Sequence, residues 1–330
     1  MQTYIRELLR ALPAAVDAEL TATVQRDAVS ELPAGVSART YPVADGIRRV
    51  SAALRSVGDA DLVHGLDATL PARVRVPSVV TVHDLAVFDI PWAFSRRRAL
   101  GRRLLLRHAA RAADALIAVS PFTAERLRAC LGRDAFVIPE APASGCVPAT
   151  AEAIDGVRDK YELAERFVLH VGNIDPRKDL GGLSAACARA GVPLVLAGVP
   201  SRSSATDGLR AQLLGYVPPA DLNALYGAAT MVAYPSRYEG FGLPPLEAMA
   251  CGAPVVAARV ASLPELVGDA ALLVTPGDTG ELAAAIADLV ADEGHRRELA
   301  GAGMARARRF SWDHTAALTA RVYRDLGVSV

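Results

Sequence analysis

Ten short runs of apolar, mostly β-branched residues alternate with helical patterns along this chain, and this alternation constrains the fold more than any other feature. Continuous apolar runs of this length are typical of parallel strands that are buried on both faces. Their alternation with helices predicts an α/β fold with parallel sheets. The predicted strands are 18–24, 61–66, 78–84, 115–120 and 135–139 in the first half, and 167–172, 193–198, 231–236, 254–259 and 271–276 in the second half.

The length of 330 residues is more than one typical domain holds. Between the two sets of predicted strands lies "PEAPASGCVPAT", residues 139–150, which is rich in proline, alanine, serine and glycine. This composition is typical of a linker between domains. We therefore expect one domain over residues 1–144 and a second that begins at residue 145.

Charge and cysteine content argue against several classes of protein. The 36 basic and 36 acidic residues give a formal net charge of zero. The overall charge therefore gives no reason to expect nucleic acid as the main partner. The four cysteines are scattered, so we expect neither a zinc site nor a disulfide framework, and a reducing cytosol fits best. No apolar run approaches the ~20 residues that span a bilayer. The charged N-terminus has no signal-peptide pattern, so we expect a cytoplasmic protein.

The stretch "YPSRYEGFGLPPLEAMACGAPVV", residues 234–256, combines a strand end, a glycine loop and a helix start. The prolines of "LPP" favour the first turn of a helix, and Gly252 favours its end. Gly240 and Gly242 allow the backbone to approach a ligand closely. A helix that begins at the carboxyl end of a parallel strand is suited to bind phosphate.

Two glutamates in this stretch, Glu239 and Glu247, stand eight residues apart. A carboxylate beside a bound phosphate would repel it, so these side chains are better suited to accept hydrogen bonds from sugar hydroxyls. A phosphate site next to a hydroxyl-binding site predicts a nucleotide sugar as the ligand. The competing interpretation is an ordinary strand–turn–helix with exposed glutamates.

A second segment, "HVGNIDPRKDL" at residues 170–180, places Arg177 and Lys178 after a predicted strand that ends at Gly172. Two adjacent cations at the carboxyl end of a strand can neutralise a diphosphate leaving group. Arginine replaces lysine almost everywhere in this chain, and Lys160 is the only other lysine. A retained lysine therefore favours a binding role over an ordinary solvated loop.

A third segment, "VTVHDL", ends a buried strand with His83 and Asp84. We predict that His83 approaches the transferred sugar, and the alternative is a core histidine with a local hydrogen bond. His64, at the end of another predicted strand, is a weaker candidate. The sequence contains no phosphate-binding P-loop and no G-x-S-x-G nucleophile motif.

Residues 94–114 form a predicted helix with seven arginines and no acidic residue before Asp114. The simpler interpretation is a solvated helix face. The alternative is a basic face that meets anionic lipid or a phosphate-bearing acceptor. The arginines are Arg96, Arg97, Arg98, Arg102, Arg103, Arg107 and Arg111.

The segments "EGFGLPPLEAMACGAPVV" and "GNIDPRKDL" resemble the retaining glycosyltransferases of family 4, also called glycosyl transferases group 1. Further segments agree, among them "VTVHDLAVFDIPWAFSRRRA", "ALIAVSPFTAERL", "LGYVPPADLNALYGAA" and "RFSWDHTAALTARVYRDL", so the resemblance covers nearly the whole chain. It implies the GT-B fold, in which two Rossmann-like domains with parallel sheets face each other across a cleft. The second domain, 145–311, would bind the nucleotide sugar. The final helix, 312–330, would return to complete the acceptor-side first domain.

The resemblance also implies roles for single residues. The basic pair would bind the donor diphosphate, the first glutamate would contact the sugar, and the histidine would approach the sugar. The residues expected to take part in the transfer itself are His83, Arg177, Lys178 and Glu239. The family needs no metal, and we expect no cofactor.

A second set of residues is expected to bind the donor. In the family the "GYV" segment lies near the base, the glycine loop contacts sugar and phosphate, and the second glutamate holds the ribose. The positions in this chain are Gly172, Asn173, Gly215, Tyr216, Val217, Gly240, Phe241, Gly242, Leu243 and Glu247. Asn173 is a departure, because many members have arginine there, so one phosphate contact is missing or replaced.

A larger departure lies at the N-terminus. Members usually begin with a strand and a glycine-rich turn before the helix that corresponds to "TYIRELLRAL". We therefore expect the first domain to lack one strand of its sheet, which leaves neighbouring ladder groups unpaired. Two hypotheses account for this: the true start lies upstream of Met1, or the chain is a shortened variant.

These observations predict a retaining hexosyltransferase, mannosyl or related, that uses a GDP- or UDP-linked sugar. The expected acceptor is a glycan or a lipid-linked glycan. The helix at 94–114 would hold the protein on the inner face of a membrane. The competing functions are a nucleotide-sugar-binding protein without turnover and an epimerase or hydrolase on the same fold.

Overall fold

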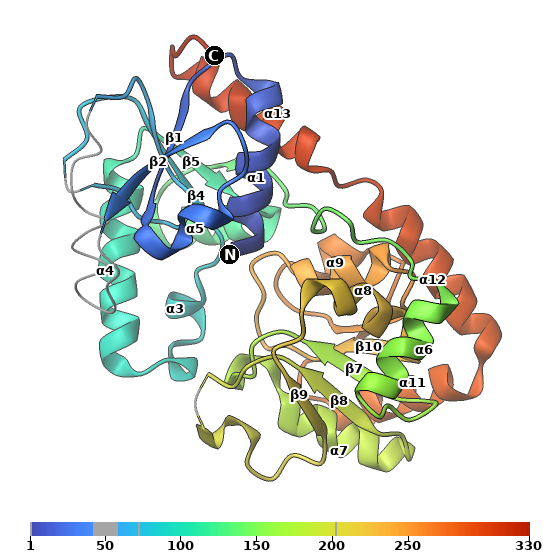
Figure 1. The fold of residues 1–330 in the computed structure, drawn as a ribbon. Coiled ribbons are helices and arrows are strands. Elements are labelled where there is room, and N and C mark those ends of the chain that lie inside the picture. The colour runs from blue at the N-terminus through green and yellow to red at the C-terminus, as the bar shows by residue number, and fades with distance from the viewer. Residues whose placement is uncertain (1, 42–58, 72, 202) are drawn as a thin grey trace. The chain divides into compact units, whose positions relative to one another are not determined.

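The chain divides into two compact units, drawn as ribbons in Figure 1. The first unit contains residues 1–140 and 310–330, and the second unit contains residues 141–309. The boundaries expected from the sequence lie at residues 144 and 311. The structure is a computed structural model, and it describes residues 2–41, 59–71, 73–201 and 203–330.

A six-stranded sheet forms the centre of the second unit, and all of its strand pairs are parallel. Across the sheet the strands occur in the order β12-β11-β10-β7-β8-β9. Their bounds are β7 Val168–Val171, β8 Leu194–Ala197, β9 Gln212–Gly215, β10 Met231–Tyr234, β11 Val255–Ala258 and β12 Leu272–Val274. The helices are α6 Ala151–Lys160, α7 Leu180–Ala190, α8 Pro219–Ala228, α9 Leu243–Ala250, α10 Leu263–Val267, α11 Thr279–Ala291 and α12 Glu293–Ala307, with 3₁₀ turns η3 Pro176–Lys178 and η4 Ser203–Thr206.

The direction of strand addition reverses at the centre of this sheet. From β7 the chain adds β8 and β9 on one side, and it then returns to add β10, β11 and β12 on the other side. The carboxyl ends of β7 and β10 are therefore neighbours, and the connections that leave them diverge. Ligands of parallel α/β sheets bind at such a reversal. The topology thus directs attention to the loops after β7 and β10.

The central strands are apolar along their whole length because both of their faces are covered. Every residue of β8, β10 and β11 is buried. One apolar cluster joins Leu196 and Ala233 of the sheet to Leu183 of α7 and Ile286 of α11. The buried runs that predicted these strands are therefore the core of the unit itself.

The strands of the first unit form two separate parallel sheets, β1-β2 and β3-β4-β5-β6. Within the described residues no strand pairs with both β1 and β3, and the expectation of one missing strand stays a prediction. The strands are β1 Leu20–Gln25, β2 Val36–Tyr41, β3 Val63–Gly65, β4 Ser78–Val82, β5 Ala115–Ala118 and β6 Phe136–Val137. The helices are α1 Gln2–Ala15, α3 Ala86–Asp89, α4 Arg96–Ala112, α5 Pro121–Leu131 and α13 Trp312–Asp325, with 3₁₀ turns η1 Arg26–Glu31 and η2 Pro91–Ala93.

The last helix, α13, belongs to the first unit and packs against α1 (Figure 1). The hydroxyl of Tyr4 on α1 lies 2.9 Å from Thr81 Oγ1 on β4. His64 on β3 lies 2.8 Å from the same oxygen through Nε2, and 2.7 Å from the hydroxyl of Tyr323 on α13 through Nδ1. Burial lowers the pKa of His64 to about 3, with the charge of His83 adding to the effect, so this imidazole is neutral. A continuous chain of hydrogen bonds thus ties both helices to the strands.

The predicted strands and helices are confirmed, and two strands of the described residues were missed. All ten predicted strand segments contain a strand, the "LPP" segment begins α9, and the basic helix is α4. The missed strands are β2, "VSARTY", and β9, "QLLG", which are largely exposed. Each lies at the edge of its sheet, where a polar side chain can face water, so neither carries a continuous apolar run. No helix in the described part of the chain has the length and apolarity needed to cross a bilayer.

A first prediction concerns the close backbone contact between Gly198 and Gly172. A Cβ at position 198 would lie 1.8 Å from the carbonyl oxygen of Gly172, so the backbone itself would have to move. We expect Gly198→Ala to lower the free energy of unfolding by about 3 kcal/mol. A Cβ at Gly181 in α7 would meet nothing within 4 Å, so Gly181→Ala is the matched control and should be neutral or stabilising. Equal melting temperatures for both variants would contradict the prediction.

Candidate functional site

Two loops meet at the reversal point of the second unit's sheet. One follows β7 over residues 172–179, and the other follows β10 over residues 235–242. The backbone N–H of Arg237 donates to the carbonyl oxygen of Arg177 at 2.6 Å, which joins the two loops directly. Together these loops carry the predicted residues Gly172, Asn173, Arg177, Lys178, Glu239, Gly240, Phe241 and Gly242.

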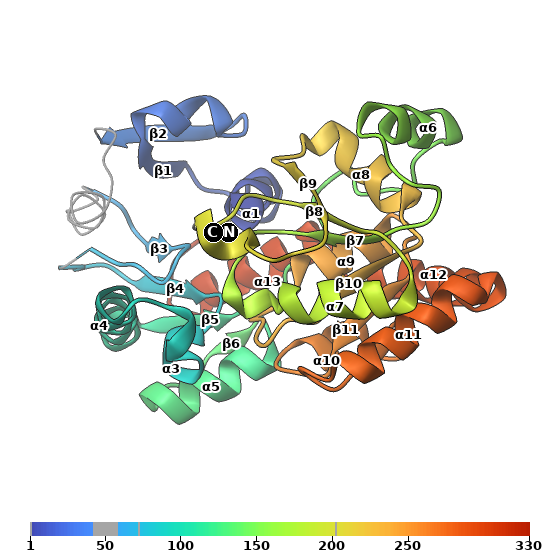
Figure 2. The same cartoon turned by 90° about the horizontal axis from the view of Figure 1, so that it is seen from below.

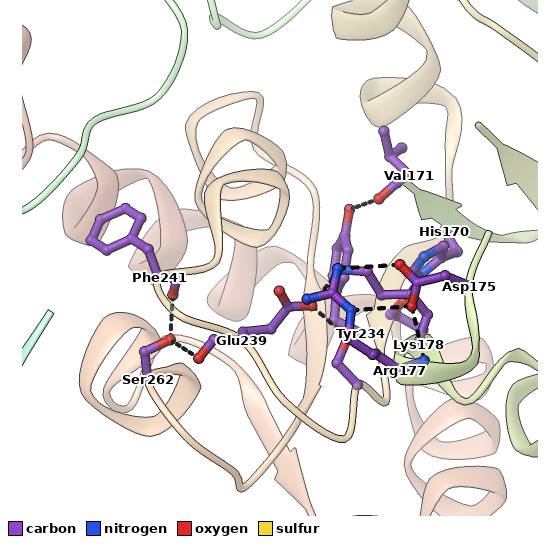
Figure 3. Close-up of polar contacts among 11 residues, drawn as sticks. His170, Val171, Asp175, Arg177, Lys178, Tyr234, Glu239, Phe241 and Ser262 are labelled. Atoms are coloured by element: carbon purple, nitrogen blue, oxygen red, sulfur yellow. Dashed lines mark hydrogen bonds and ion pairs between the residues drawn. The ribbon is translucent and has the colours of Figure 1, made fainter. Parts of the chain in front are cut away.

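An ion pair between Lys178 and Glu239 links the loops through side chains (Figure 3). Lys178 Nζ donates to Glu239 Oε1 at 2.6 Å, and Ser236 Oγ donates to the same oxygen at 2.7 Å. Lys178 is only 7% exposed, so this cation lies inside the protein and not on a solvated loop. Burial alone would raise the pKa of Glu239, but the charge of Lys178 and the two hydrogen bonds hold that pKa below its ordinary value. Glu239 is therefore a carboxylate at neutral pH.

Arg177 is oriented by a carboxylate on its own loop. Asp175 accepts hydrogen bonds from the Arg177 backbone N–H at 2.8 Å and from its guanidinium at 3.2 Å and 3.3 Å. Arg237 of the other loop donates to Asp179 at 2.8 Å. Each arginine thus has its planar donor group held in one direction before any ligand arrives.

Ser262 holds the glycine loop in place from beneath (Figure 3). Its buried hydroxyl lies 3.0 Å from the carbonyl oxygen of Glu239 and 2.8 Å from that of Phe241. These two contacts satisfy buried carbonyls and fix the path of the loop backbone between them. Position 242 must be glycine, because φ is +112° and a Cβ would lie 2.7 Å from Leu266.

The N-terminus of α9 offers fewer amides than its position implies. Leu243 begins the helix, and Pro244 and Pro245 follow it, so the first turn has lost two N–H groups. Leu246 N donates to Gly242 O at 3.3 Å. The expected phosphate contact at the start of this helix is therefore limited to the amide of Leu243 and the loop before it.

Glu247 is buried in the second turn of α9, and the buried rings of His170 and Tyr234 belong to β7 and β10. The carboxylate of Glu247 is 8% exposed, and its charge adds to the burial that raises the pKa of Tyr234 far above the ordinary value. The Tyr234 hydroxyl donates to Val171 O at 2.8 Å, and its ring lies 4.9 Å from that of His170. His170 Nδ1 lies 2.9 Å from Ala233 O, and burial lowers its pKa to about 4, so it is neutral.

The "GYV" segment starts at the last residue of β9, a strand that lies on the far side of β8 from β7 (Figure 2). Gly215 has φ of +66° and its carbonyl accepts from Gly198 N at 2.8 Å. Tyr216 is 71% exposed, whereas Val217 is buried. An exposed aromatic ring is available to stack on a planar ligand.

His83 lies in the first unit, directly after β4. Its Nδ1 lies 2.7 Å from Glu140 Oε1, and its Nε2 lies 3.0 Å from Leu66 O. Both partners are acceptors, so both ring nitrogens carry protons. Burial alone would lower the pKa of His83, but the hydrogen bond and charge of Glu140 raise it above the ordinary value. The two acceptors and the raised pKa therefore favour the protonated form of His83 over a free base.

Several side chains of the site were missed by the sequence reasoning. Ser236, Ser262, Asp175 and Arg237 hold the predicted residues in place, but none of them was assigned a role from the sequence. Only one carried a usable signal: Asp175 precedes proline and accepts from Arg177 N, which is the arrangement of a helix N-cap. Within the described ranges no group of three or more histidines, cysteines or acidic residues is placed to hold a metal.

Two family models match the chain. Residues 1–141 match Glycosyltransferase Family 4, and residues 156–306 match Glycosyl transferases group 1. The O-antigen chain mannosyltransferase B of Escherichia coli is 35% identical over 309 residues, which cover 84% of this chain and 78% of that protein. The chain belongs to glycosyltransferase family 4 and is a glycosyltransferase.

Solved structures place its fold in the GT-B class. The sucrose-phosphate synthase of Thermosynechococcus elongatus has a TM-score of 0.78 at 26% identity, covering 98% of this chain and 92% of that one. Anabaena HepE, solved in complex with UDP and glucose, has a TM-score of 0.76 at 23% identity, covering 98% of this chain and 95% of that one. The predicted GT-B fold, with parallel-sheet α/β domains, is confirmed.

A second prediction follows from the His83–Glu140 pair. Because the pKa of His83 is raised in the folded state, the pair stabilises fully below the ordinary value of 6.5, and this contribution is lost as pH rises through the raised pKa. We expect the melting temperature of the wild type to fall more steeply above pH 6.5 than that of Glu140→Gln. Asp288→Asn, which removes the exposed contact with His295, should keep the wild-type slope. Parallel slopes for wild type and Glu140→Gln would refute this assignment.

Proposed function

We propose that this protein transfers a hexose, with retention of anomeric configuration, from a UDP- or GDP-linked donor to a glycan or a lipid-linked glycan. The observation that carries the proposal is the buried Lys178–Glu239 pair at the reversal point of the sheet, with Arg177 beside it. Two cations and an oriented carboxylate are what a sugar diphosphate needs at the bond that breaks.

Lys178 can hold Glu239 and the donor at the same time. Its ammonium has three N–H donors, and the contact with Glu239 uses one. The others are available to phosphate oxygens, whose negative charge grows as the diphosphate leaves. Arg177 and the amide of Leu243 would share that charge. Stabilisation that increases toward the transition state accelerates the reaction rather than only tightening binding.

Glu239 serves as an acceptor for the sugar in this proposal. Lys178 and Ser236 both donate to Oε1, so Oε2 is the atom that would accept from a sugar hydroxyl. The same contacts argue against Glu239 as a nucleophile. They lower its pKa, and they engage oxygen lone pairs that would have to attack the sugar. A front-face reaction fits better: the acceptor hydroxyl attacks from the side that the diphosphate leaves, and the donor phosphate takes its proton. Double displacement would need a free carboxylate at the sugar.

The remaining donor contacts follow from positions along the sheet. Glu247, in the second turn of α9, would accept from the ribose hydroxyls. The exposed ring of Tyr216, with Gly215 and Val217, would lie against the base. Gly172 and Asn173 would approach the diphosphate from the end of β7, and His83 would place its positive charge near the transferred sugar.

Mannose is the proposed sugar, and the base stays open between guanine and uracil. The relative from Escherichia coli is named for mannosyl transfer to an O-antigen chain, which supports both the sugar and a glycan acceptor. HepE is solved with UDP and glucose, which supports a nucleotide-sugar donor. No metal is included, because the cations described above already meet the diphosphate.

A donor panel tests the proposed function. GDP-mannose, UDP-glucose and related donors are incubated with the protein and a mannoside acceptor, with and without EDTA, and proton NMR reads the anomeric configuration of the product. We expect transfer from one donor with retention and no loss in EDTA. An inverted product would overturn the front-face reaction. Donor binding without transfer or hydrolysis would favour a binding protein, whereas free sugar would favour a hydrolase and an epimerised donor would favour an epimerase.

A third prediction concerns Lys178 itself. We expect Lys178→Ala to weaken donor binding and turnover together by roughly 1.5–3 kcal/mol, because a charge-assisted contact is lost. Lys160→Ala is the control, since Lys160 is the only other lysine and pairs with Asp221 on the surface. Calorimetry with the accepted donor measures affinity, and a melting curve checks the fold because Glu239 is left without its partner. Unchanged donor affinity in a folded Lys178→Ala variant would remove Lys178 from the site.

A further inference from the structure

The solvent-facing side of α4 combines leucines with arginines. Ser95 caps the helix, accepting from Arg98 N at 3.4 Å, and the helix continues to Ala112. From residue 90 to residue 113 the sequence contains seven arginines and no acidic residue. The exposed residues that share one side of the helix, named here the α4 face, are Arg96, Arg97, Leu100, Leu104, Arg107 and Arg111.

The leucines of the α4 face are not part of the core. The opposite side of the helix already supplies the packing residues Ala99, Leu106, Ala109 and Ala110, which are buried. Leu100 is 58% exposed and Leu104 is 56% exposed. They stand four residues apart, so they form one stripe along the helix. Trp92, on the turn just before the helix, is 61% exposed.

Side-chain contacts hold this helix in a fixed position. Arg103 Nε donates to Val87 O on α3 at 2.7 Å. The guanidinium groups of Arg103 and Arg107 lie over the ring of Phe88 at 5.5 Å and 5.4 Å. In Figure 1, α4 stands beside α3 at the edge of the first unit. The α4 face is therefore presented by an ordered element and not by a flexible tail.

A small open hollow adjoins this face. It lies between α4 and α5, and Arg107 and Arg111 form one wall, with Cys130 and Leu131 on the other. Arginine side chains that line a hollow are suited to meet a phosphate group, which accepts bidentate hydrogen bonds.

We propose that α4 docks on the surface of a membrane that contains anionic lipids. The leucines and Trp92 enter the boundary between headgroups and acyl chains, and the arginines meet lipid phosphates around them. An interfacial helix needs this combination of an apolar stripe and flanking cations. Nucleic acid would use the cations alone, and it would leave Leu100 and Leu104 against a polar backbone. The proposal does not rest on which sugar or acceptor the protein uses.

Flotation of the full chain with vesicles tests the docking. We expect binding to vesicles of phosphatidylcholine with phosphatidylglycerol, and little binding to phosphatidylcholine alone. The variant Leu100→Gln, Leu104→Gln should bind at least ~10-fold more weakly, although both positions are exposed and the fold is kept. The variant Arg97→Glu, Arg107→Glu, Arg111→Glu should lose binding. Its charge-matched control reverses three exposed arginines elsewhere: Arg308→Glu, Arg309→Glu, Arg321→Glu.

Fluorescence gives a second readout at the helix itself. The chain has two tryptophans, of which Trp312 is buried, so a blue shift on adding anionic vesicles reports Trp92. Trp92→Phe should abolish the shift. Wild-type flotation by the leucine variant, or the same loss of binding in the control variant, would overturn the proposal. Absence of flotation with anionic vesicles would overturn it too, and tight binding to duplex DNA or RNA in its place would assign the face to nucleic acid.

Discussion

The candidate site of the second unit depends on the Lys178–Glu239 ion pair, because this contact brings a cation and a carboxylate together from the two loops at the reversal of the sheet. Parallel strands with a reversal place the ends of β7 and β10 side by side, and the ion pair then joins the loops that follow them. A buried ion pair requires both of its residues, because loss of either one leaves the other as an uncompensated buried charge. The hydroxyl of Ser236 and the backbone bond between Arg237 and Arg177 distribute that constraint over both loops.

The first unit contains a similar side-chain pair, His83–Glu140, at the end of β4. His83 lies after β4 as Lys178 lies after β7, and each is paired with a largely buried glutamate, Glu140 or Glu239. Glu140 is the last residue of the first unit before the chain passes to the second. The returning helix α13 is tied to the same point, since Thr315 donates to Pro139 O at 2.8 Å. Both passages of the chain are thus held beside the buried charge.

Sequence reasoning succeeded where one segment contains its own explanation. Continuous apolar runs predict buried strands, and "GFGLPP" contains the glycine and prolines that begin α9. It failed where the reason lies far away in the sequence. Ser262 matters only because the carbonyls of Glu239 and Phe241 reach it, and β2 and β9 are strands only because a neighbouring strand pairs with them. Pro244 and Pro245 show a second reason for failure. They correctly predict the start of α9, but they also remove two of the backbone N–H groups that were expected to bind phosphate there.

Although the formal net charge is zero, the basic residues of this protein occur in two different arrangements, one buried and one exposed. Inside the second unit, Lys178 is buried and neutralised one-to-one, so its effect is local and depends on geometry. On α4, the arginines are mostly exposed and repeat along a helix with no acidic neighbour in sequence, so their effect is collective and weakened by salt. A buried cation can distinguish a diphosphate from water because its partners are fixed. An exposed row of cations can only recognise a surface, and two exposed leucines in that row decide which kind of surface it fits.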